Sequence, residues 1–237
     1  MVEEITILLA EAAIEPFPNE LLKNIKAKKY LAKVGKSPDE IILDVSEHGF
    51  LMKNLKKKYK RGRSDIVHLA LLACHGSIIA KRKKLNVVIH TYNDVLIYIN
   101  SETRIPRALE RFKGLFSQLF KFKTIPPKKE NPLIYSLEGT LEHFIKENRE
   151  KHDIIVEFSV KGERMSLPEI AEELAKRKKP LLIFGAFQKG QIETLPESLI
   201  DKKIAIFEEG LDLFTAISHI LAAIEYYEEE LQKSKYF

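Results

Sequence analysis

Four short apolar runs constrain the fold of this chain more than any other feature of its sequence. They cover residues 5–14, 154–158, 180–184 and 203–207. The first run is nearly continuous and lies between charged residues, which is typical of a strand that is buried on both faces of a sheet. The segments between the later runs have the periodicity and capping residues of helices. Because strands that alternate with helices form parallel sheets, the sequence predicts an α/β fold with a parallel sheet.

Other segments predict the remaining elements. In the first half of the chain we expect a short basic helix at 21–30, a turn at 36–39, a helix that is apolar nearly all round from residue 64, and two strands at 86–90 and 95–99 joined by a turn. In the second half we expect a helix at 108–120 that starts near Pro106, a helix at 138–148, a helix after a capping box at 166–169, and a long closing helix at 211–232. Residues 121–132, with three prolines, are the best candidate for a linker.

The most basic segment of the chain lies directly before the apolar helix. Seven lysines and arginines fall between Lys53 and Arg63, with no acid among them. Such a segment repels itself unless a polyanion lies nearby. Asp65 ends the run, where it favours the positive end of the helix dipole, and Ser64 is expected to cap the helix with its hydroxyl. Charge alone leaves two interpretations open, a solvated loop or an RNA or DNA site.

A second group of basic side chains consists only of arginines. Arg107 and Arg111 are four residues apart, and Arg104 precedes them by about one helical turn. They are expected to project from the face opposite an apolar stripe. Lysine dominates elsewhere in the chain, whereas a guanidinium matches phosphates and base edges better than an ammonium group does. A solvated helix face is the alternative interpretation.

Composition excludes several classes of protein. Thirty-nine basic and 34 acidic residues give a net charge of +5, which permits a polyanionic partner without requiring one. Cys74 is the only cysteine, so the chain can form neither an internal disulfide nor a thiolate zinc site. Cys74 and His68 are expected to be core residues. The acidic N-terminus and the lack of any apolar stretch of about 20 residues predict a cytoplasmic protein that is neither secreted nor embedded in a membrane.

Three of the expected strands end in segments that suit a ligand site. Ligands of open parallel sheets bind beyond the carboxyl ends of the strands. Residues 158–162, 185–190 and 207–211 occupy these ends, and the middle segment contains Gly185 and Gly190. The pattern matches neither a Walker loop nor a dinucleotide fingerprint, so neither ATP nor NAD is supported.

Three motifs together resemble those of a known family. They are Arg61-Gly62-Arg63-Ser64-Asp65-Ile66-Val67-His68, then Glu102-Thr103-Arg104-Ile105-Pro106-Arg107 with Arg111-Phe112 and Gly114-Leu115, and finally Gly185-Ala186-Phe187 with Gly190. In order and spacing the chain resembles the SPOUT-class methyltransferases that methylate N1 of a pseudouridine in small-subunit ribosomal RNA. These enzymes act in ribosome biogenesis and rRNA processing.

The resemblance implies a fold and an assembly. It implies one SPOUT methyltransferase domain over residues 1–237, with a parallel sheet, helices on both faces and a family-specific basic insertion. Residues 1–123 would form an N-terminal part with the RNA-binding basic segment. Residues 133–237 would form a C-terminal part that binds S-adenosylmethionine and is threaded through a deep trefoil knot. The resemblance further implies a homodimer and no metal.

The resemblance also assigns site residues. RNA contacts are expected from Arg61, Arg63, Arg104, Arg107 and Arg111, and cofactor contacts from Gly185, Gly190, Ile206, Phe207, Glu208 and Leu211. Asp65 is the candidate catalytic carboxylate, which either orients an RNA-binding arginine or helps to deprotonate the acceptor. The chain departs from the family at Ser64, at Gln188-Lys189 and at residues 208–210.

Two other functions stay open at this point. The same arginines would serve a non-catalytic RNA-binding factor of ribosome assembly in which the cofactor loops have decayed. A related SPOUT methyltransferase that acts on tRNA or on a different base is the other alternative.

Overall fold

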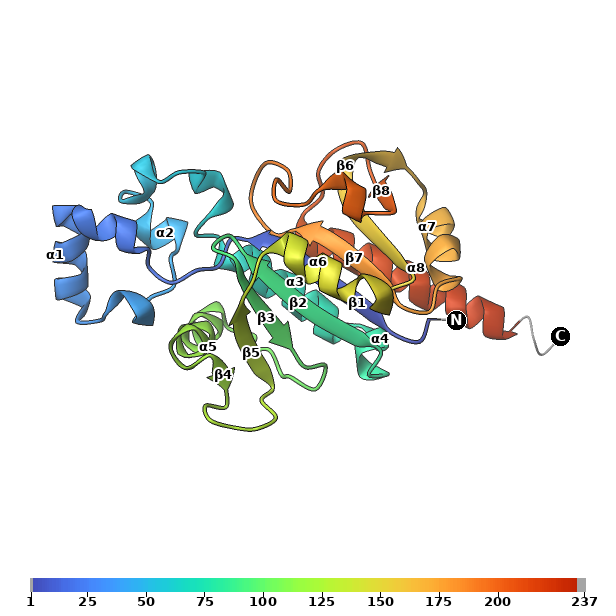
Figure 1. Ribbon diagram of the computed structural model, residues 1–237, viewed down its shortest axis with the longest axis horizontal. Helices are drawn as coiled ribbons and strands as arrows, with labels where there is room; N and C mark the ends of the chain where they lie inside the picture. Colours follow the sequence, from blue (N-terminus) through green and yellow to red (C-terminus); the bar gives the residue numbers. More distant parts are fainter. Residues whose placement is uncertain (1, 234–237) are drawn as a thin grey trace.

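A computed structural model describes residues 2–233 of the chain. Within these residues, eight strands form one sheet in the order β4-β5-β3-β2-β1-β7-β6-β8 (Figure 1). The strands are β1 (Ile5–Ala12), β2 (Leu85–Thr91), β3 (Val95–Ile99), β4 (Thr124–Ile125), β5 (Ile134–Glu138), β6 (Ile154–Arg164), β7 (Pro180–Gly185) and β8 (Lys202–Ala205). All four apolar runs of the sequence are therefore strands of the same sheet.

The sheet is mixed, so the prediction of a parallel sheet is correct for only part of it. Strands β2, β1, β7, β6 and β8 are parallel to one another. Strands β3, β5 and β4 continue the sheet in antiparallel pairs. The change of direction occurs at the predicted hairpin, where Asp94 adopts a φ of 55° in the turn between β2 and β3. Such left-handed backbone suits Asp and Asn.

Helices cover both faces of the sheet, as the resemblance implied. They are α1 (Ile25–Val34), α2 (Val45–His48), α3 (Ser64–Gly76), α4 (Ile78–Lys81), α5 (Leu109–Phe122), α6 (Leu141–Asn148), α7 (Leu167–Ala175) and α8 (Leu213–Lys233). Helices α3, α5, α7 and α8 pack on one face in the larger core, and α6 packs on the other.

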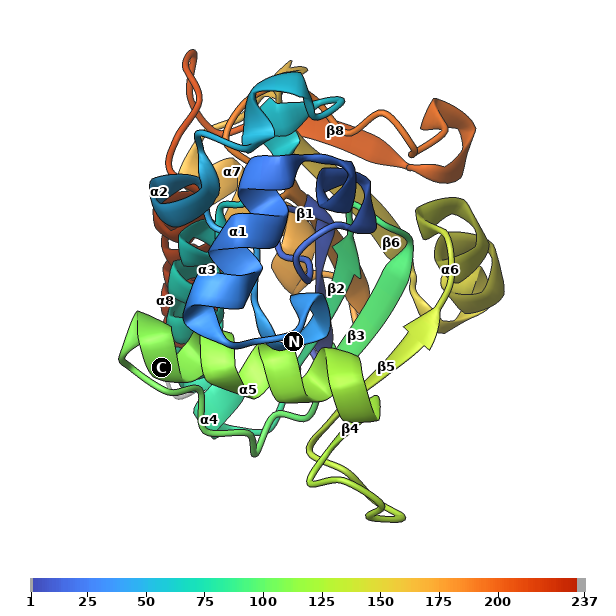
Figure 2. The ribbon, with the colours of Figure 1, turned by 90° about the vertical axis from the view of Figure 1, so that its left-hand side faces the viewer.

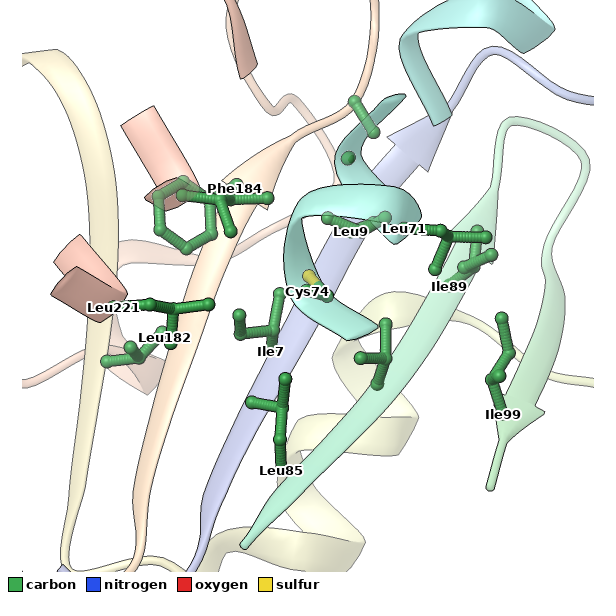
Figure 3. Packing of buried hydrophobic residues seen from close by; sticks show 14 of the residues in the cluster. Ile7, Leu9, Leu71, Cys74, Leu85, Ile89, Ile99, Leu182, Phe184 and Leu221 are labelled. Carbon is green, nitrogen blue, oxygen red and sulfur yellow. The ribbon is translucent and has the colours of Figure 1, made fainter. Parts of the chain in front are cut away.

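Helix α3 lies at the centre of the larger core. Cys74 and Leu71 face Ile7 and Leu9 of β1 in this core (Figure 3). His68 is also buried, and its Nε2 atom lies 2.7 Å from the carbonyl oxygen of Pro106. The prediction that His68 and Cys74 are core residues is confirmed.

The part of the sequence between β1 and α3 forms a separate small cluster of apolar side chains. It includes Phe17, Leu43 and Met52 and is formed by residues 17–55. Figure 1 shows this segment beyond the carboxyl end of β1, and Figure 2 views the molecule from that side, with α1 in front of the sheet. The basic helix predicted at 21–30 is divided: a 3-10 helix at Asn19–Lys23 precedes α1, because the Asn24 side chain accepts a hydrogen bond from the Lys26 amide and starts a new helix there.

Residues 121–132 do not separate two units. Their first residues complete α5, and β4 pairs with β5 directly across this segment. Strand β5 occupies Ile134–Glu138, so the helix predicted at 138–148 begins only at Leu141. The capping box at Ser166 and Glu169 is confirmed at the start of α7. No helix within residues 2–233 is long and apolar enough to cross a membrane.

Candidate active site

A cavity lies where the sequence placed a ligand, at the carboxyl ends of the parallel strands. Its volume is about 400 Å³. Its lining residues come from three segments, namely 157–160 of β6, 184–192 at the end of β7 and in the loop after it, and 204–213 at the end of β8 and in the loop after it, although Ala186, Ala205 and Glu208 do not contribute. The convergence follows from the strand order, because β7, β6 and β8 are parallel neighbours and their carboxyl ends share one edge.

The lining combines aromatic, acidic and backbone groups. The rings of Phe158 and Phe184 are stacked with centroids 4.7 Å apart. Glu157, Glu209 and Asp212 bring carboxylates to the cavity. Burial raises the pKa of Glu157, and Lys203, whose Nζ atom lies 3.3 Å from the Glu157 carboxylate, offsets only part of this effect. Apolar walls with a few acidic groups suit a cationic ligand that carries an aromatic base.

Neither of two glycines in the lining would accept a side chain without strain. Gly190 has a φ of 113°, which an L side chain rarely adopts. A Cβ atom on Gly185 would lie 2.8 Å from the ring of Phe187. The loop between them lines the cavity. Together with the size of the cavity and its acidic groups, these positions fit S-adenosylmethionine, whose cationic methyl donor needs no metal for activation. Within residues 2–233 no group of three or more acidic, histidine or cysteine side chains could hold a metal ion.

Five of the six residues expected at the cofactor site line the cavity. They are Gly185, Gly190, Ile206, Phe207 and Leu211. Glu208 does not line it: its side chain is 82% exposed, and its carboxylate lies 3.5 Å from Arg164. Its neighbour Glu209 faces the cavity instead. The chain bends at residues 206–209, so a motif assigned by position alone does not fix which acid points inward.

Arg63 joins the basic segment to the cavity. Its side chain lines the cavity, and its guanidinium forms a two-point ion pair with Asp65. The hydrogen bonds from Arg63 lower the pKa of Asp65, and burial, which acts in the opposite direction, does not outweigh them. A carboxylate with a lowered pKa is a weak base. The geometry therefore suits the orienting role of Asp65 better than deprotonation.

Ser64 does not cap helix α3, contrary to the expectation. It is the first residue of the helix, and the position before it belongs to Arg63, whose side chain makes no capping hydrogen bond. The Ser64 hydroxyl is buried without a hydrogen-bond partner among the described residues. This first helical position is one that proline favours, because no partner is needed for its backbone nitrogen. Asp65 does lie in the first turn, as predicted.

Arg61 is buried, although the resemblance assigned it to RNA. Only 3% of its side chain is exposed. Its Nε and Nη2 atoms donate to the two carboxylate oxygens of Glu15 at 2.6 and 2.7 Å, and Nη1 donates to Glu20. The ring of Tyr92 lies 5.0 Å from the guanidinium carbon. In this structure Arg61 stabilises the fold and is not presented to a partner.

The self-repulsion inferred for the basic segment is also relieved from within the chain. Lys60 is fully buried and pairs with Glu11, and Lys57 pairs with Glu193. These acids lie far away in the sequence, so a count of charges within the segment cannot find them. Lys53, Lys56 and Lys58 remain exposed.

Arg104, Arg107 and Arg111 are all exposed, as expected for a surface that binds a partner. Arg111 lies on α5, whereas the other two precede the helix, which begins at Leu109 and not at Pro106. The rings of His68 and Phe112 stack with centroids 4.6 Å apart and so hold α3 against α5. This contact ties the helix that follows Arg63 to the arginine segment.

The fold and the cavity define an α/β protein with a pocket at the carboxyl ends of its parallel strands and with one arginine, Arg63, in the lining of that pocket. The family model for EMG1/NEP1 methyltransferases matches residues 7–225. The chain therefore belongs to the EMG1/NEP1 methyltransferase family, and the resemblance drawn from its three motifs is confirmed.

Named relatives cover almost the whole chain. The chain is 36% identical over 226 residues to the ribosomal RNA small subunit methyltransferase Nep1 of Staphylothermus marinus, covering 95% of this chain and 97% of that protein. Identity to Nep1 of Thermococcus onnurineus is 34% over 221 residues, covering 93% and 98%. The crystal structure of Archaeoglobus fulgidus Nep1 bound to S-adenosylhomocysteine aligns with a TM-score of 0.79 at 27% identity, covering 97% of this chain and all of that one.

Proposed function

We propose that this protein transfers a methyl group from S-adenosylmethionine to N1 of a pseudouridine in small-subunit ribosomal RNA. One observation carries the proposal: Arg63 belongs to the basic segment and lines the cavity formed by the three strand ends. A polyanion held by the arginines would thus reach the mouth of the cofactor pocket. Relatives named as small-subunit rRNA methyltransferases, and one solved with S-adenosylhomocysteine, support both the substrate and the cofactor.

The cofactor supplies an electrophilic methyl group on a sulfonium centre. In the transfer, the methyl carbon would bond to N1 as its bond to sulfur breaks, S-adenosylhomocysteine would leave, and the proton of N1 would pass to solvent water. The protein has to align the acceptor with the methyl group and exclude water. Phe158 and Phe184 offer apolar surface for the adenine, and the loop that contains Gly190 borders the cavity. Glu209 and Asp212 bring negative charge to the cavity that holds the cation.

The arginines would hold the RNA. Arg104, Arg107 and Arg111 are exposed and suited to phosphates, whereas Arg63, fixed by Asp65, would guide the target nucleotide to the pocket. The target base has to leave its stack to meet the methyl group, and single-stranded loops allow this most easily. Asp65 orients Arg63 in this account, because its lowered pKa makes it a poor base.

Calorimetry with S-adenosylhomocysteine tests the cofactor assignment. We expect one binding site per chain. Absence of binding at high ligand concentration would favour the alternative function, a non-catalytic RNA-binding factor of ribosome assembly. Methylation of tRNA or of a base other than pseudouridine would favour the other alternative, a related methyltransferase with a different substrate.

Two further features belong to the proposal, a homodimer and a trefoil knot. Leu69 and Phe214 are exposed apolar side chains on α3 and α8, the helices next to the cavity, and a second chain would cover such groups. Light scattering at micromolar concentration would give twice the mass of the chain if the dimer forms. For the knot, the support is the strand order β7-β6-β8 at the edge of the sheet. A cytoplasmic location follows from the proposed role in ribosome biogenesis.

A further inference from the structure

The ammonium group of Lys60 lies inside the protein, although Lys53, Lys56 and Lys58 of the same segment face solvent. The side chain is fully buried. Its Nζ atom donates hydrogen bonds to the Glu11 carboxylate and to the carbonyl oxygen of Gln191, and it lies 3.0 Å from a carboxylate oxygen of Glu193. The same atom lies 4.4 Å from the centre of the Phe187 ring. Three of these four partners belong to one loop, residues 187–194.

Glu11 extends the same network to the end of that loop. One oxygen of its carboxylate faces Lys60, and the other accepts hydrogen bonds from the Glu193 amide at 2.7 Å, the Thr194 amide at 2.8 Å and the Thr194 hydroxyl at 3.0 Å. Glu11 itself has a φ of 49°, an unusual backbone conformation for a glutamate. Burial raises the pKa of Glu11, but the hydrogen bonds from Lys60 and from the loop amides have the larger combined effect and lower it below its usual value. The carboxylate therefore stays ionised.

The loop held in this way forms one wall of the cavity. Phe187, Gly190 and Ile192 line it, and the loop belongs to no helix or strand. Loops without ladder hydrogen bonds depend on side chains to fix their shape. Lys60, from the basic segment, and Glu11, near the end of β1, supply such contacts to the loop.

We propose that Lys60 is a positioning residue that holds the cofactor-binding loop, residues 185–194, in the shape that binds S-adenosylmethionine. The proposal deepens the proposed function and rests on it for the identity of the ligand. Removing the ammonium group leaves the buried carboxylate of Glu11 without its counterion, whereas Glu193 keeps Lys57, so the tie between Glu11 and the loop is weakened and the loop moves away from its position. Lys60 lies between the lysines and arginines of the basic segment, and an RNA bound there would thus act on the cofactor loop through one residue.

The test compares Lys60→Met with Lys58→Met. Both remove one lysine charge from the same segment, but the Lys58 side chain is exposed, whereas that of Lys60 is buried against the loop. Hydrogen exchange of the ligand-free proteins reports the order of residues 185–194, and calorimetry with S-adenosylhomocysteine reports the affinity of the pocket. In Lys60→Met we expect the Glu193 and Thr194 amides to exchange at least about tenfold faster and the Kd to rise by about tenfold or more, as fits removal of one partner of a buried ion pair. Lys58→Met should match the wild type in both measurements.

A purely structural role gives a different result. Lys60→Met would then unfold at a lower temperature than the wild type. Well below that temperature, however, its hydrogen exchange in the loop and its Kd would stay within twofold of the wild-type values. This result would overturn the proposal. If Lys60→Met does not fold, Glu11→Gln removes the same ion pair while keeping the size and shape of the side chain. The same two measurements on Glu11→Gln then decide the proposal in the same way. Wild-type protein that fails to bind S-adenosylhomocysteine would contradict the proposed function, and the exchange result would still decide whether Lys60 orders the loop.

Discussion

The guanidinium of Arg63 and the carboxylate of Asp65 face each other in two parallel hydrogen bonds, Nε to Oδ1 and Nη2 to Oδ2, each 2.8 Å long. Two-point contact fixes the plane of the guanidinium as well as its position. Arg63 reaches the rim of the cavity from the residue directly before α3. The pair therefore sets the direction of a positive charge at the entrance to the cofactor pocket.

Asp65→Asn should weaken RNA binding without changing the pH dependence of methyl transfer. The amide offers Arg63 only one acceptor, so we expect RNA affinity to fall by about three- to tenfold, the range for loss of a charge-assisted contact at a partly exposed site. Because its pKa is lowered, Asp65 is ionised throughout the neutral range and does not titrate there. Filter binding and pH–rate profiles of both proteins check this. Disappearance of the acidic limb of the profile in Asp65→Asn would identify Asp65 as the base.

Arg61→Met should act mainly on stability. It leaves the carboxylate of Glu15 buried without its partner, which costs about 3–5 kcal/mol in comparable buried pairs. Arg63→Met is the matched control, because Arg63 is partly exposed, and its unfolding free energy should change by less than about 1 kcal/mol. Urea denaturation measures both. A stable Arg61→Met with reduced RNA affinity would restore the RNA contact that the motif suggested for Arg61.

The buried ion pairs show what the sequence could not reveal. Lys60 and Arg61 are separated by more than forty residues from the acids that neutralise them, Glu11 and Glu15. A count of local charges therefore made them part of an exposed basic patch. The motif identified the family correctly, but the role of each basic residue depends on neighbours that only the fold brings together.

Replacing Arg104, Arg107 and Arg111 together by Gln should reduce the salt dependence of RNA binding. Each lost phosphate contact lowers the slope of log K against log salt concentration by about 0.7 to 0.9. Stability should change by less than about 0.5 kcal/mol per site, because all three side chains are exposed. Arg82→Gln, which removes an arginine at the end of α4, serves as the control. An unchanged slope in the triple variant would remove these arginines from the RNA site.

Gly190→Ala should weaken cofactor binding more than it weakens the fold. At a φ of 113° an alanine is strained by about 1–3 kcal/mol, which the loop can relieve by moving away from the cavity. We expect the Kd for S-adenosylhomocysteine to rise by about tenfold. Gly114→Ala, on α5 with open space around the added Cβ, should leave the Kd unchanged. Equal affinities in the two variants would show that the loop at Gly190 does not shape the site.

The acid sensitivity of the fold should depend on Asp44. Burial raises its pKa, but hydrogen bonds from Lys113 and Ser46 lower it below the ordinary value of 3.8. A carboxyl whose folded pKa is lowered stabilises the protein above its unfolded pKa, and this contribution is lost as the pH falls through the folded pKa. The difference in unfolding free energy between wild type and Asp44→Asn should therefore be constant near neutral pH and shrink below about pH 4. A difference that does not shrink as the pH is lowered through the acidic range would contradict this role.

Much of the fold, and most of the cofactor pocket, could be predicted from residues close together in the sequence. Apolar runs gave β1, β6, β7 and β8, and glycines at the strand ends gave the pocket. Strands β4 and β5 were missed because they are short and lie on either side of three prolines. Ser64 was misplaced by one position because its type suits a cap, whereas the helix begins with it. Such errors arise where tertiary contacts outweigh local preference.

Transfer of labelled methyl from S-adenosylmethionine to small-subunit rRNA fragments, followed by nucleoside analysis, tests the proposed function most directly. We expect the label in N1-methylpseudouridine, only in RNA that already contains pseudouridine, and loss of transfer in a variant that lacks Arg63. Label on any other nucleoside, or no transfer by protein that binds both S-adenosylhomocysteine and the RNA, would contradict the proposed reaction.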